Sequence, residues 1–325
     1  MASIKFDNVY LSDYYTLVGP LEVMSKLKKY DSKMNDYYYG ESTFEQAEIK
    51  MQKKVIEGIL NKKGLYEKDV SMIVGGDLLN QIVSTSYASK NFNIPLIGIY
   101  SACSTFTESL IVASTFLNNK DISNIITVTS SHNLSAERQF RYPIEYGSPK
   151  PHTATFTATG SVACLITHDK SKIKIESATI GKVIDMGITD VNNMGAVMAP
   201  AASNTIYEHL KDLKRSLSYY DLILTGDLGC NGLSILKKYT SITYGMELNN
   251  IKDSGCSLYC DTQEVYSGGS GPVCLPLVLF NKILLSKKYK KILIVGTGSL
   301  HNTTGVNQHL SIPAISHAVS LEVLS

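Results

Sequence analysis

The chain has 325 residues, of which 44% are hydrophobic and 18% charged, and this composition excludes an intrinsically disordered protein. The 31 basic and 29 acidic side chains leave a net charge of +2, so the overall charge gives no argument for a nucleic acid or a strongly anionic membrane as partner. Only Arg138, Arg141 and Arg215 are arginines, and the first two are close neighbours in the sequence.

Targeting segments and cysteines indicate a cytosolic type of chain. No apolar stretch reaches the roughly 18 residues that a transmembrane helix needs, and the N-terminus MASIKFDNVYLSDYY lacks the apolar core of a cleaved signal peptide. The six cysteines are spread too widely for a small disulfide scaffold, so we expect reduced thiols. The spacing CSLYC, from Cys256 to Cys260, is only a weak indication of metal binding.

Strand-like and helical patterns alternate along the chain, which is typical of an α/β protein. Strand-like runs occur at 72–74, 94–99, 125–128 and 161–166. Helical patterns occur at 44–62, 104–119, 198–213 and 272–286, and the second and fourth are almost entirely apolar. We therefore expect those two helices to be buried.

The sequence also repeats itself weakly. MIVGGDLLN around Asp77 resembles LILTGDLGCNG around Asp227, and three further matches follow in the same order, all about 150–167 residues apart. These are YSACST with YSGGSG, IITVTSS with ILIVGTG, and GSVACLI with SHAVSLEV. The pattern predicts two copies of one βαβαβαββ unit, residues 1–168 and 169–325, packed as one body.

Cys103 is the first candidate for chemistry, because it lies directly after a predicted strand and directly before a buried helix. The positive end of the helix dipole lowers the pKa of a thiol in this place, which is where an enzyme positions a cysteine nucleophile. A small buried thiol without chemistry is the competing interpretation, and the spacing alone favours it slightly.

The motifs together resemble one family. GGDLLNQ, SACST, TSSHNLSAERQFRYPIEYG, KPHTATFTATGS, VIDMGITDVNNMGAVMAPAA, DLILTGDL and YSGGSG run in order across essentially the whole chain. They are similar to the stage V sporulation protein AD family of endospore-forming bacteria, within the thiolase and ketoacyl synthase superfamily. The resemblance implies a thiolase-like α/β fold, whose duplicated halves form a five-layered α-β-α-β-α body.

The resemblance also implies a degenerate condensing-enzyme site. Ketoacyl synthases of type III pair the cysteine with a histidine and an asparagine, but this chain has Gly226 and Asp227 at the first position and glycines with Ser270 at the second. Glycine has no side chain, and an aspartate beside a thiolate raises the pKa of the thiol. We therefore expect a binding protein that has lost its catalysis, with Cys103 as a vestigial nucleophile.

The ligand that the resemblance implies is dipicolinic acid (pyridine-2,6-dicarboxylate). The residues expected to bind it are Cys103, Ser104, Asp77, His132, Arg138, Arg141, Gly269 and Ser270. Arginine matches a carboxylate with two parallel hydrogen bonds, and the glycine-rich loop offers backbone N–H groups.

Structural roles remain open for several of these residues. Arg138 and Arg141 can equally tie their own segment to the body of the protein. His132 is more simply a local hydrogen-bond partner, and the equivalence of Asp77 and Asp227 favours a turn-stabilising role.

The resemblance further implies partners and a location. We expect a peripheral protein of the spore inner membrane that acts with the membrane proteins of the same stage V sporulation operon, without nucleic acid or a cofactor. Calcium accompanying the ligand and a homodimer both stay open; thiolase relatives pair through a sheet edge, expected here near Ile125–Thr129. The alternatives are an active acyl transferase that uses Cys103, and a scaffold with a vestigial cavity.

Overall fold

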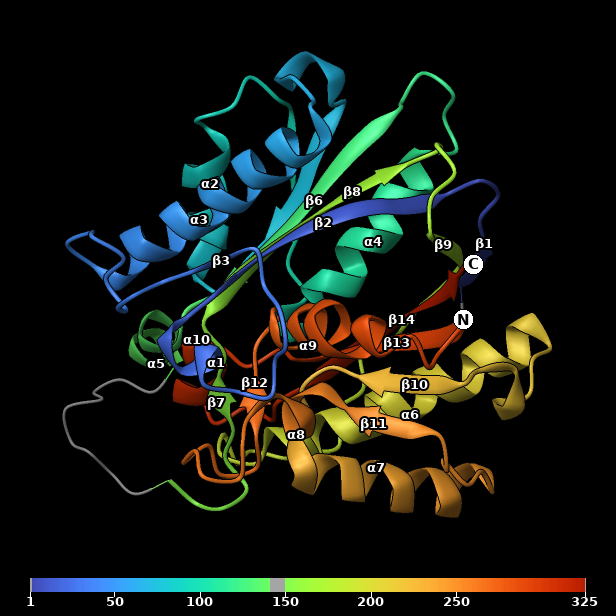
Figure 1. Ribbon diagram of the computed structural model, residues 1–325. Helices are drawn as coiled ribbons and strands as arrows, with labels where there is room; N and C mark the ends of the chain where they lie inside the picture. Colours follow the sequence, from blue (N-terminus) through green and yellow to red (C-terminus); the bar gives the residue numbers. More distant parts are fainter. Residues whose placement is uncertain (1, 141–149, 325) are drawn as a thin grey trace.

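A computed structural model describes residues 2–140 and 150–324 of the chain (Figure 1). The strands are β1 Ala2–Lys5, β2 Tyr10–Val18, β3 Ser32–Lys33, β4 Met72–Gly76, β5 Leu96–Gly98, β6 Asn124–Ser131, β7 Phe156–Thr157, β8 Gly160–Thr167, β9 Ile173–Ile180, β10 Leu222–Thr225, β11 Ile251–Asp253, β12 Gly269–Ser270, β13 Lys291–Ser299 and β14 Ala314–Val323. The helices are α1 Pro20–Val23, α2 Phe44–Lys63, α3 Val83–Ser89, α4 Thr105–Phe116, α5 Asn133–Phe140, α6 Met194–Leu213, α7 Gly229–Tyr244, α8 Ser254–Leu258, α9 Cys274–Val278 and α10 Thr303–Asn307.

The strands form two equivalent sets of five. One set has the order β5-β4-β6-β8-β2 and the other β11-β10-β13-β14-β9, and in both the first three strands are parallel and the last two antiparallel. Among the strands of the described residues, a short pairing of β2 with β9, at Tyr10↔Lys174 and Leu11↔Ile173, is the one that joins the two sets. The internal repeat predicted from the sequence is therefore present in the strand order.

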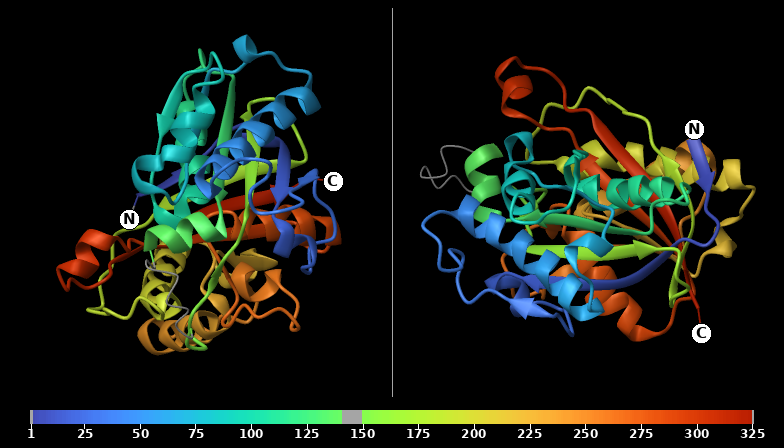
Figure 2. Two further views of the ribbon diagram at one scale, coloured as in Figure 1. Left: turned by 90° about the vertical axis from the view of Figure 1, so that its left-hand side faces the viewer. Right: turned by 90° about the horizontal axis from the view of Figure 1, so that it is seen from above.

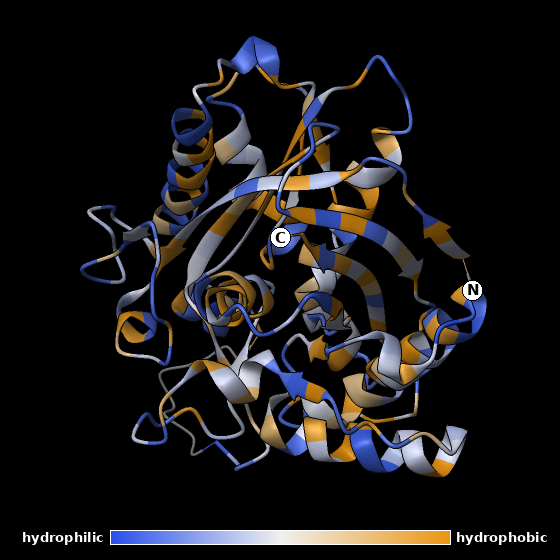
Figure 3. Ribbon diagram, turned by 45° about the vertical axis from the view of Figure 1, so that its right-hand side comes forward, coloured by the Kyte–Doolittle hydropathy of each residue, from blue (hydrophilic) through white to orange (hydrophobic). Residues whose placement is uncertain are grey.

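Helices and sheets alternate in five layers. The helix α4 contacts β4 and β6 of the first set and β13 and β14 of the second, while α2 covers the outer face of one set and α6 that of the other (Figures 1 and 2). Hydrophobic residues gather on the inner strands and hydrophilic residues on the outer loops (Figure 3). The predicted thiolase-like α-β-α-β-α fold is confirmed.

The two apolar helices are buried, as predicted, and they pack together in the central layer. After α9 the chain continues through one wider helical turn, Leu279–Ile283, and a tighter one, Leu284–Ser286. Phe280 on this segment stacks on Tyr14 of β2, with ring centroids 4.1 Å apart, and meets Phe106 of α4 edge-on at 6.1 Å. Residues from both halves thus share one core.

The outer helix α2 shows how the sequence sets element boundaries. Thr43 caps its N-terminus by accepting a hydrogen bond from the Gln46 N–H, and Gly64 ends it in a left-handed conformation. One apolar stripe, which includes Met51, Val55 and Ile59, is fully buried against the first sheet.

The expected pairing edge is wrong. Strand β6, which contains Ile125–Thr129, lies between β4 and β8 inside the sheet, whereas β5 forms the outer edge of this set. The edge was expected from the resemblance to thiolases, whereas the continuous hydrophobicity of this strand is typical of an interior strand.

Candidate functional site

Cys103 lies in a tight turn between β5 and α4. Ala102 before it has φ of +48°, a left-handed conformation that residues other than glycine rarely adopt. The Thr105 hydroxyl at the start of α4 donates a hydrogen bond to the Ala102 carbonyl oxygen at 2.6 Å and holds the turn. The predicted place of Cys103, directly before a buried helix, is confirmed.

The glycine-rich loop of the second half faces the thiol. The Cys103 Sγ lies 4.0 Å from the Ser270 Oγ. Gly271 follows with φ of +96°, and a Cβ there would come within 2.7 Å of the Ser131 hydroxyl, so the loop needs glycine at this point. The fold thus brings together two predicted site residues from opposite halves of the chain.

Asp227 holds this loop in place. Its Oδ2 accepts hydrogen bonds from the Ser270 hydroxyl at 3.0 Å and the Gly271 N–H at 2.9 Å, and its Oδ1 accepts one from the Thr297 hydroxyl at 2.6 Å. All three donors come from the second half. The carboxylate is completely buried and its partners are fixed before any ligand arrives.

Burial and the nearby Asp227 carboxylate raise the pKa of Cys103 well above its ordinary value. Burial also raises the pKa of Asp227. The helix-dipole argument, which predicts a lowered pKa for Cys103, is therefore outweighed, and the sulfur is held as a thiol. A thiol is a weak hydrogen-bond donor and a poor nucleophile.

Two adjoining cavities lie at this place. A slot of about 40 Å³ contains Cys103, and a wider cavity of about 610 Å³ opens beside it. Leu78, Tyr100 and Phe140 line both. The slot is further lined by Ala102, Ala136, Glu137, Thr157, Met194, Ser270, Ser299 and His301, and the wider cavity by Leu79, Asn80, Gln81, Ile82, Gly98, Ile99, Gln139, Asn302, Thr303 and Thr304.

Ser104 and Gly269 flank the site without lining either cavity. The Ser104 hydroxyl is buried 3.1 Å from that of Thr107 and packs against Gly296. Gly269 pairs with Phe156 between β12 and β7. Their ligand-binding role stays a prediction.

Asp77 acts inside its own turn. Its Oδ1 accepts the Leu79 N–H at 2.9 Å, and its Oδ2 accepts the N–H and the hydroxyl of Thr85 at 2.8 and 2.7 Å. This confirms the structural role that the repeat favoured. Asp77 lines neither cavity.

His132 and Arg138 point toward the α2 side of the molecule. One ring nitrogen of His132, Nε2, lies 2.8 Å from the Tyr37 carbonyl oxygen, and burial lowers the pKa of the imidazole. The Arg138 guanidinium pairs with Glu45 at 3.3 Å and lies over the Phe44 ring at 5.5 Å. Arg138 therefore forms the structural tie that was one of the two interpretations, and Arg141 lies outside the described residues.

The expectation of six reduced thiols is wrong for two of them. Cys230 at the start of α7 and Cys256 in α8 form a disulfide, with their Cα atoms 4.7 Å apart. They are 26 residues apart in the sequence, and no spacing rule connects them. Cys103, Cys164, Cys260 and Cys274 are free.

Neither a cluster of metal ligands nor a membrane-spanning helix occurs in the described part of the chain. In residues 2–140 and 150–324, no three His, Cys, Asp or Glu side chains gather as metal ligands. Within these ranges, no helix combines the length and hydrophobicity needed to span a bilayer.

Sequence reasoning missed most of the cavity wall. Tyr100 and Phe140 lie in the motifs YSACST and TSSHNLSAERQFRYPIEYG but were not singled out as site residues, and His301 lies in none of the quoted motifs. His301 had one usable signal, because it follows the carboxyl end of β13, where ligands of α/β sheets gather. The rule that ligands gather beyond the carboxyl ends of strands selects the loop at 296–299 of the sequence, and His301 lies two residues further on.

Comparison with solved structures supports the fold alone. A 3-oxoacyl-[acyl-carrier-protein] synthase III from Aquifex aeolicus VF5 matches with a TM-score of 0.55 and 13% identity, covering 97% of each chain. A variant of OleA from Xanthomonas campestris matches with a TM-score of 0.63 and 12% identity, covering 98% of this chain and 99% of that one.

Sequence comparison shows the family. The sequence model described as Stage V sporulation protein AD (SpoVAD) matches residues 2–322. The "Stage V sporulation protein AD" of Bacillus subtilis (strain 168) is 39% identical over 321 residues, which are 97% of this chain and 94% of that protein. The chain belongs to the Stage V sporulation protein AD family.

Proposed function

We propose that the protein binds dipicolinic acid without transforming it. It supports uptake of this ligand into the developing spore as a peripheral subunit of a membrane channel complex at the spore inner membrane, and acts again in germination. One observation carries the non-catalytic part: the buried Asp227 carboxylate lies beside Cys103 and raises the pKa of its thiol, and the family resemblance implies a catalytic histidine at this position in a condensing enzyme. The identity of the ligand follows from the family resemblance.

The cavities offer a flat aromatic acid a suitable shape. The slot at Cys103 is too small for a pyridine ring with two carboxylates, so the ring lies in the wider cavity, between Tyr100 and Phe140. One carboxylate then reaches into the slot, where the Cys103 thiol and the Ser299 hydroxyl, otherwise unpaired among the described residues, are the proposed donors, since the Ser270 hydroxyl already donates to Asp227.

The charge of the ligand requires compensation. Lys150 is held at the slot wall by an ion pair with Glu137, at 3.0 Å, and is the cation proposed to turn toward the dianion. No cofactor takes part in this proposal, and calcium, if it accompanies dipicolinate, arrives with the ligand.

Isothermal titration calorimetry with dipicolinate tests the proposal. We expect saturable heat with the wild-type protein, and binding at least about tenfold weaker in Phe140→Ala, which removes one wall of both cavities. A Tyr66→Ala variant removes an aromatic ring that is 73% exposed elsewhere and serves as the control. No heat at millimolar ligand contradicts dipicolinate binding.

An acyl transferase that uses Cys103 is the second candidate. The left-handed Ala102 turn, which presents the sulfur at the start of α4, is the observation in its favour. Incubation with acyl-CoA followed by mass spectrometry decides: an acyl adduct on Cys103 that is lost in Cys103→Ser supports the enzyme, and an unmodified protein removes this candidate.

A further inference from the structure

Eight lysines from three separate segments form one cationic surface, which we call the lysine face. Its members are Lys26, Lys28, Lys29, Lys252, Lys282, Lys287, Lys288 and Lys290. All are exposed except Lys26 and Lys282, which are half-buried. The net charge of +2 conceals this cluster, because the segments that build it are far apart in the sequence.

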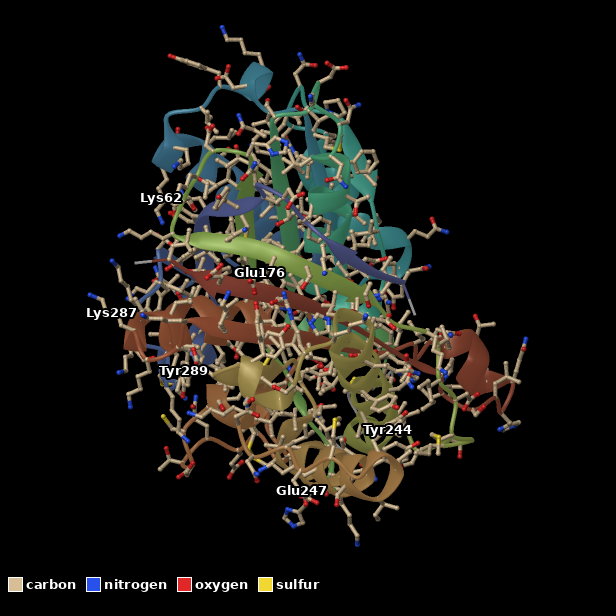
Figure 4. The ribbon with its side chains drawn as sticks, turned by 90° about the vertical axis from the view of Figure 1, so that its right-hand side faces the viewer. Lys62, Glu176, Tyr244, Glu247, Lys287 and Tyr289 are labelled. Atoms are coloured by element: carbon tan, nitrogen blue, oxygen red, sulfur yellow. A yellow bond between two sulfur atoms is a disulfide. The ribbon has the colours of Figure 1, made fainter. Side chains whose placement is uncertain are left out.

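Contacts between the segments place these lysines side by side. The Lys28 N–H donates to the Asn281 carbonyl oxygen at 3.0 Å, and Lys29 and Leu285 line one small cavity. The Lys252 ammonium group donates to the Tyr289 hydroxyl at 3.1 Å. Figure 4 shows Lys287 and Tyr289 on one side of the molecule, away from Tyr244 and Glu247.

The positive charge of the lysine face is only partly neutralised, since Asp221 lies beside Lys290 and Asp31 lines the same small cavity as Lys29. Within the described part of the chain, Lys26 alone of the eight forms an ion pair, with Asp261 at 2.9 Å. Burial, followed by repulsion from Lys26 and Lys252, lowers the pKa of Lys282. The approach of an anionic surface to the lysine face is therefore electrostatically favourable.

Two exposed hydrophobic side chains adjoin the lysines in the sequence. Met24, two residues before Lys26, is 64% exposed, and Leu285, two residues before Lys287, is 38% exposed. Clusters of four to eight basic residues bind anionic bilayers, and stable attachment of a peripheral protein usually needs a second, hydrophobic contribution.

We propose that the lysine face docks the protein on an anionic lipid bilayer, with the ammonium groups among the head groups and Met24 and Leu285 entering the interface. This inference rests on the proposed peripheral role and names the surface that performs it. An acidic protein segment is disfavoured because the face contains no arginine, the residue that pairs bidentately with carboxylates.

The lysine face and the ligand site are made of different residues. None of the residues that line the two cavities at Cys103 belongs to the lysine face. Substitutions on the lysine face therefore leave the cavity walls unchanged.

Vesicle sedimentation tests the docking surface. The probes are vesicles of phosphatidylcholine alone and of phosphatidylcholine with about one-third phosphatidylglycerol. We expect binding to the anionic vesicles only, with loss in about 0.5 M salt, where exposed charges are screened. Absence of binding to the anionic vesicles at low salt overturns the proposal.

Matched variants identify the surface. Lys28→Glu with Lys29→Glu is expected to weaken binding by at least about tenfold, since each lysine near an anionic surface contributes appreciably. Lys237→Glu with Lys238→Glu changes the net charge equally on exposed residues of α7 and should bind within about twofold of wild type. Equal loss in both pairs overturns the proposal, because it then reflects net charge alone.

A third pair of variants, at the two hydrophobic residues, separates bilayer insertion from charge attraction. Met24→Ser with Leu285→Ser should weaken vesicle binding severalfold while leaving the net charge and the thermal midpoint close to wild type. Unchanged binding removes these side chains from the docking contact and contradicts the proposed insertion. Dipicolinate titration of the Lys28/Lys29 variant separates the two proposals. If neither this variant nor the wild-type protein binds dipicolinate, the proposed function is contradicted and the docking proposal is not.

Discussion

The two halves of the molecule have an aspartate at the equivalent position, and these two aspartates have different roles. Asp77 accepts hydrogen bonds from Leu79 and Thr85 within its own turn, whereas Asp227 reaches the 270–271 loop and faces Cys103 of the other half. The backbone units are equivalent, so the difference lies in what each carboxylate holds. Duplication supplied two turns, and only the second became part of a site.

The largest expected difference between the halves concerns the disulfide. Cys230–Cys256 ties α7 to α8 in the second half, and its loss by Cys230→Ser should lower the free energy of unfolding by about 3 kcal/mol, as expected for a loop of 26 residues. Denaturant unfolding with and without a reducing agent measures this. Cys260→Ser, which removes a free thiol, is the control and should leave the stability unchanged. If a reducing agent does not change the free energy of unfolding of the wild-type protein, the prediction is contradicted.

Replacing each aspartate by asparagine sharpens the comparison. Asp77→Asn and Asp227→Asn should each cost about 1–3 kcal/mol of stability, because asparagine accepts fewer of the buried hydrogen bonds. Only Asp227→Asn should also change dipicolinate binding. The comparison fails if Asp77→Asn lowers the affinity for dipicolinate as much as Asp227→Asn does at an equal loss of stability.

The contact between the halves should depend on pH. Glu22 of α1 is fully buried, accepts a hydrogen bond from the Tyr259 hydroxyl of the second half, and has its pKa raised to about 7 by burial. Its contribution to stability is fully present below the ordinary pKa of 4.5 and is lost as the pH rises through about 7. Wild-type protein should therefore be less stable at pH 8.5 than at pH 6.5, by roughly 1 kcal/mol in total for such a carboxyl, because the loss levels off once the pH exceeds the folded-state pKa.

A Glu22→Gln variant isolates this group. It keeps an acceptor for Tyr259 and removes the titration, so its thermal midpoint should change less between pH 6.5 and 8.5. Burial raises the pKa of Glu48 to about 8 and that of Asp253 to about 7, and both add to the residual slope. Equal slopes in variant and wild type contradict the assignment to Glu22.

The smallest expected effect is that of Arg138→Ala. The arginine is 49% exposed and paired with Glu45, so its removal should cost less than about 1 kcal/mol. Dipicolinate affinity should remain within about twofold of wild type if the tie to α2 is its role. A large loss of affinity with unchanged stability restores Arg138 to the ligand site.

Local pattern was sufficient for many of the elements but not for the site. Amphipathic patterns predicted α2 and α6, and apolar runs predicted α4 and the 272–286 helical segment, because burial and caps act over neighbouring residues, whereas the 16-residue helix α7 was not predicted. The slot depends on Cys103, Ser270 and Asp227 meeting across the two halves, and the Cys230–Cys256 pair meets across two helices. Such contacts depend on packing distances that no spacing in the chain encodes.

Charge shows the same limit. The sum of +2 correctly excluded a uniformly basic protein but concealed the lysine face, which exists only when residues 26–29 and 282–290 lie together. The arginine pair that stood out in the sequence proved less informative, because Arg138 is held by Glu45.

The most direct test is the pH profile of Cys103 alkylation by iodoacetamide, followed by mass spectrometry in wild type, Asp227→Asn and Asp77→Asn. Because burial and the Asp227 carboxylate keep the sulfur protonated, we predict slow alkylation of wild type up to pH 9. Asp227→Asn should react faster, by on the order of tenfold, and Asp77→Asn should not. Rapid alkylation of wild type at neutral pH, unchanged in Asp227→Asn, would show a reactive thiolate and contradict a site that binds without reacting.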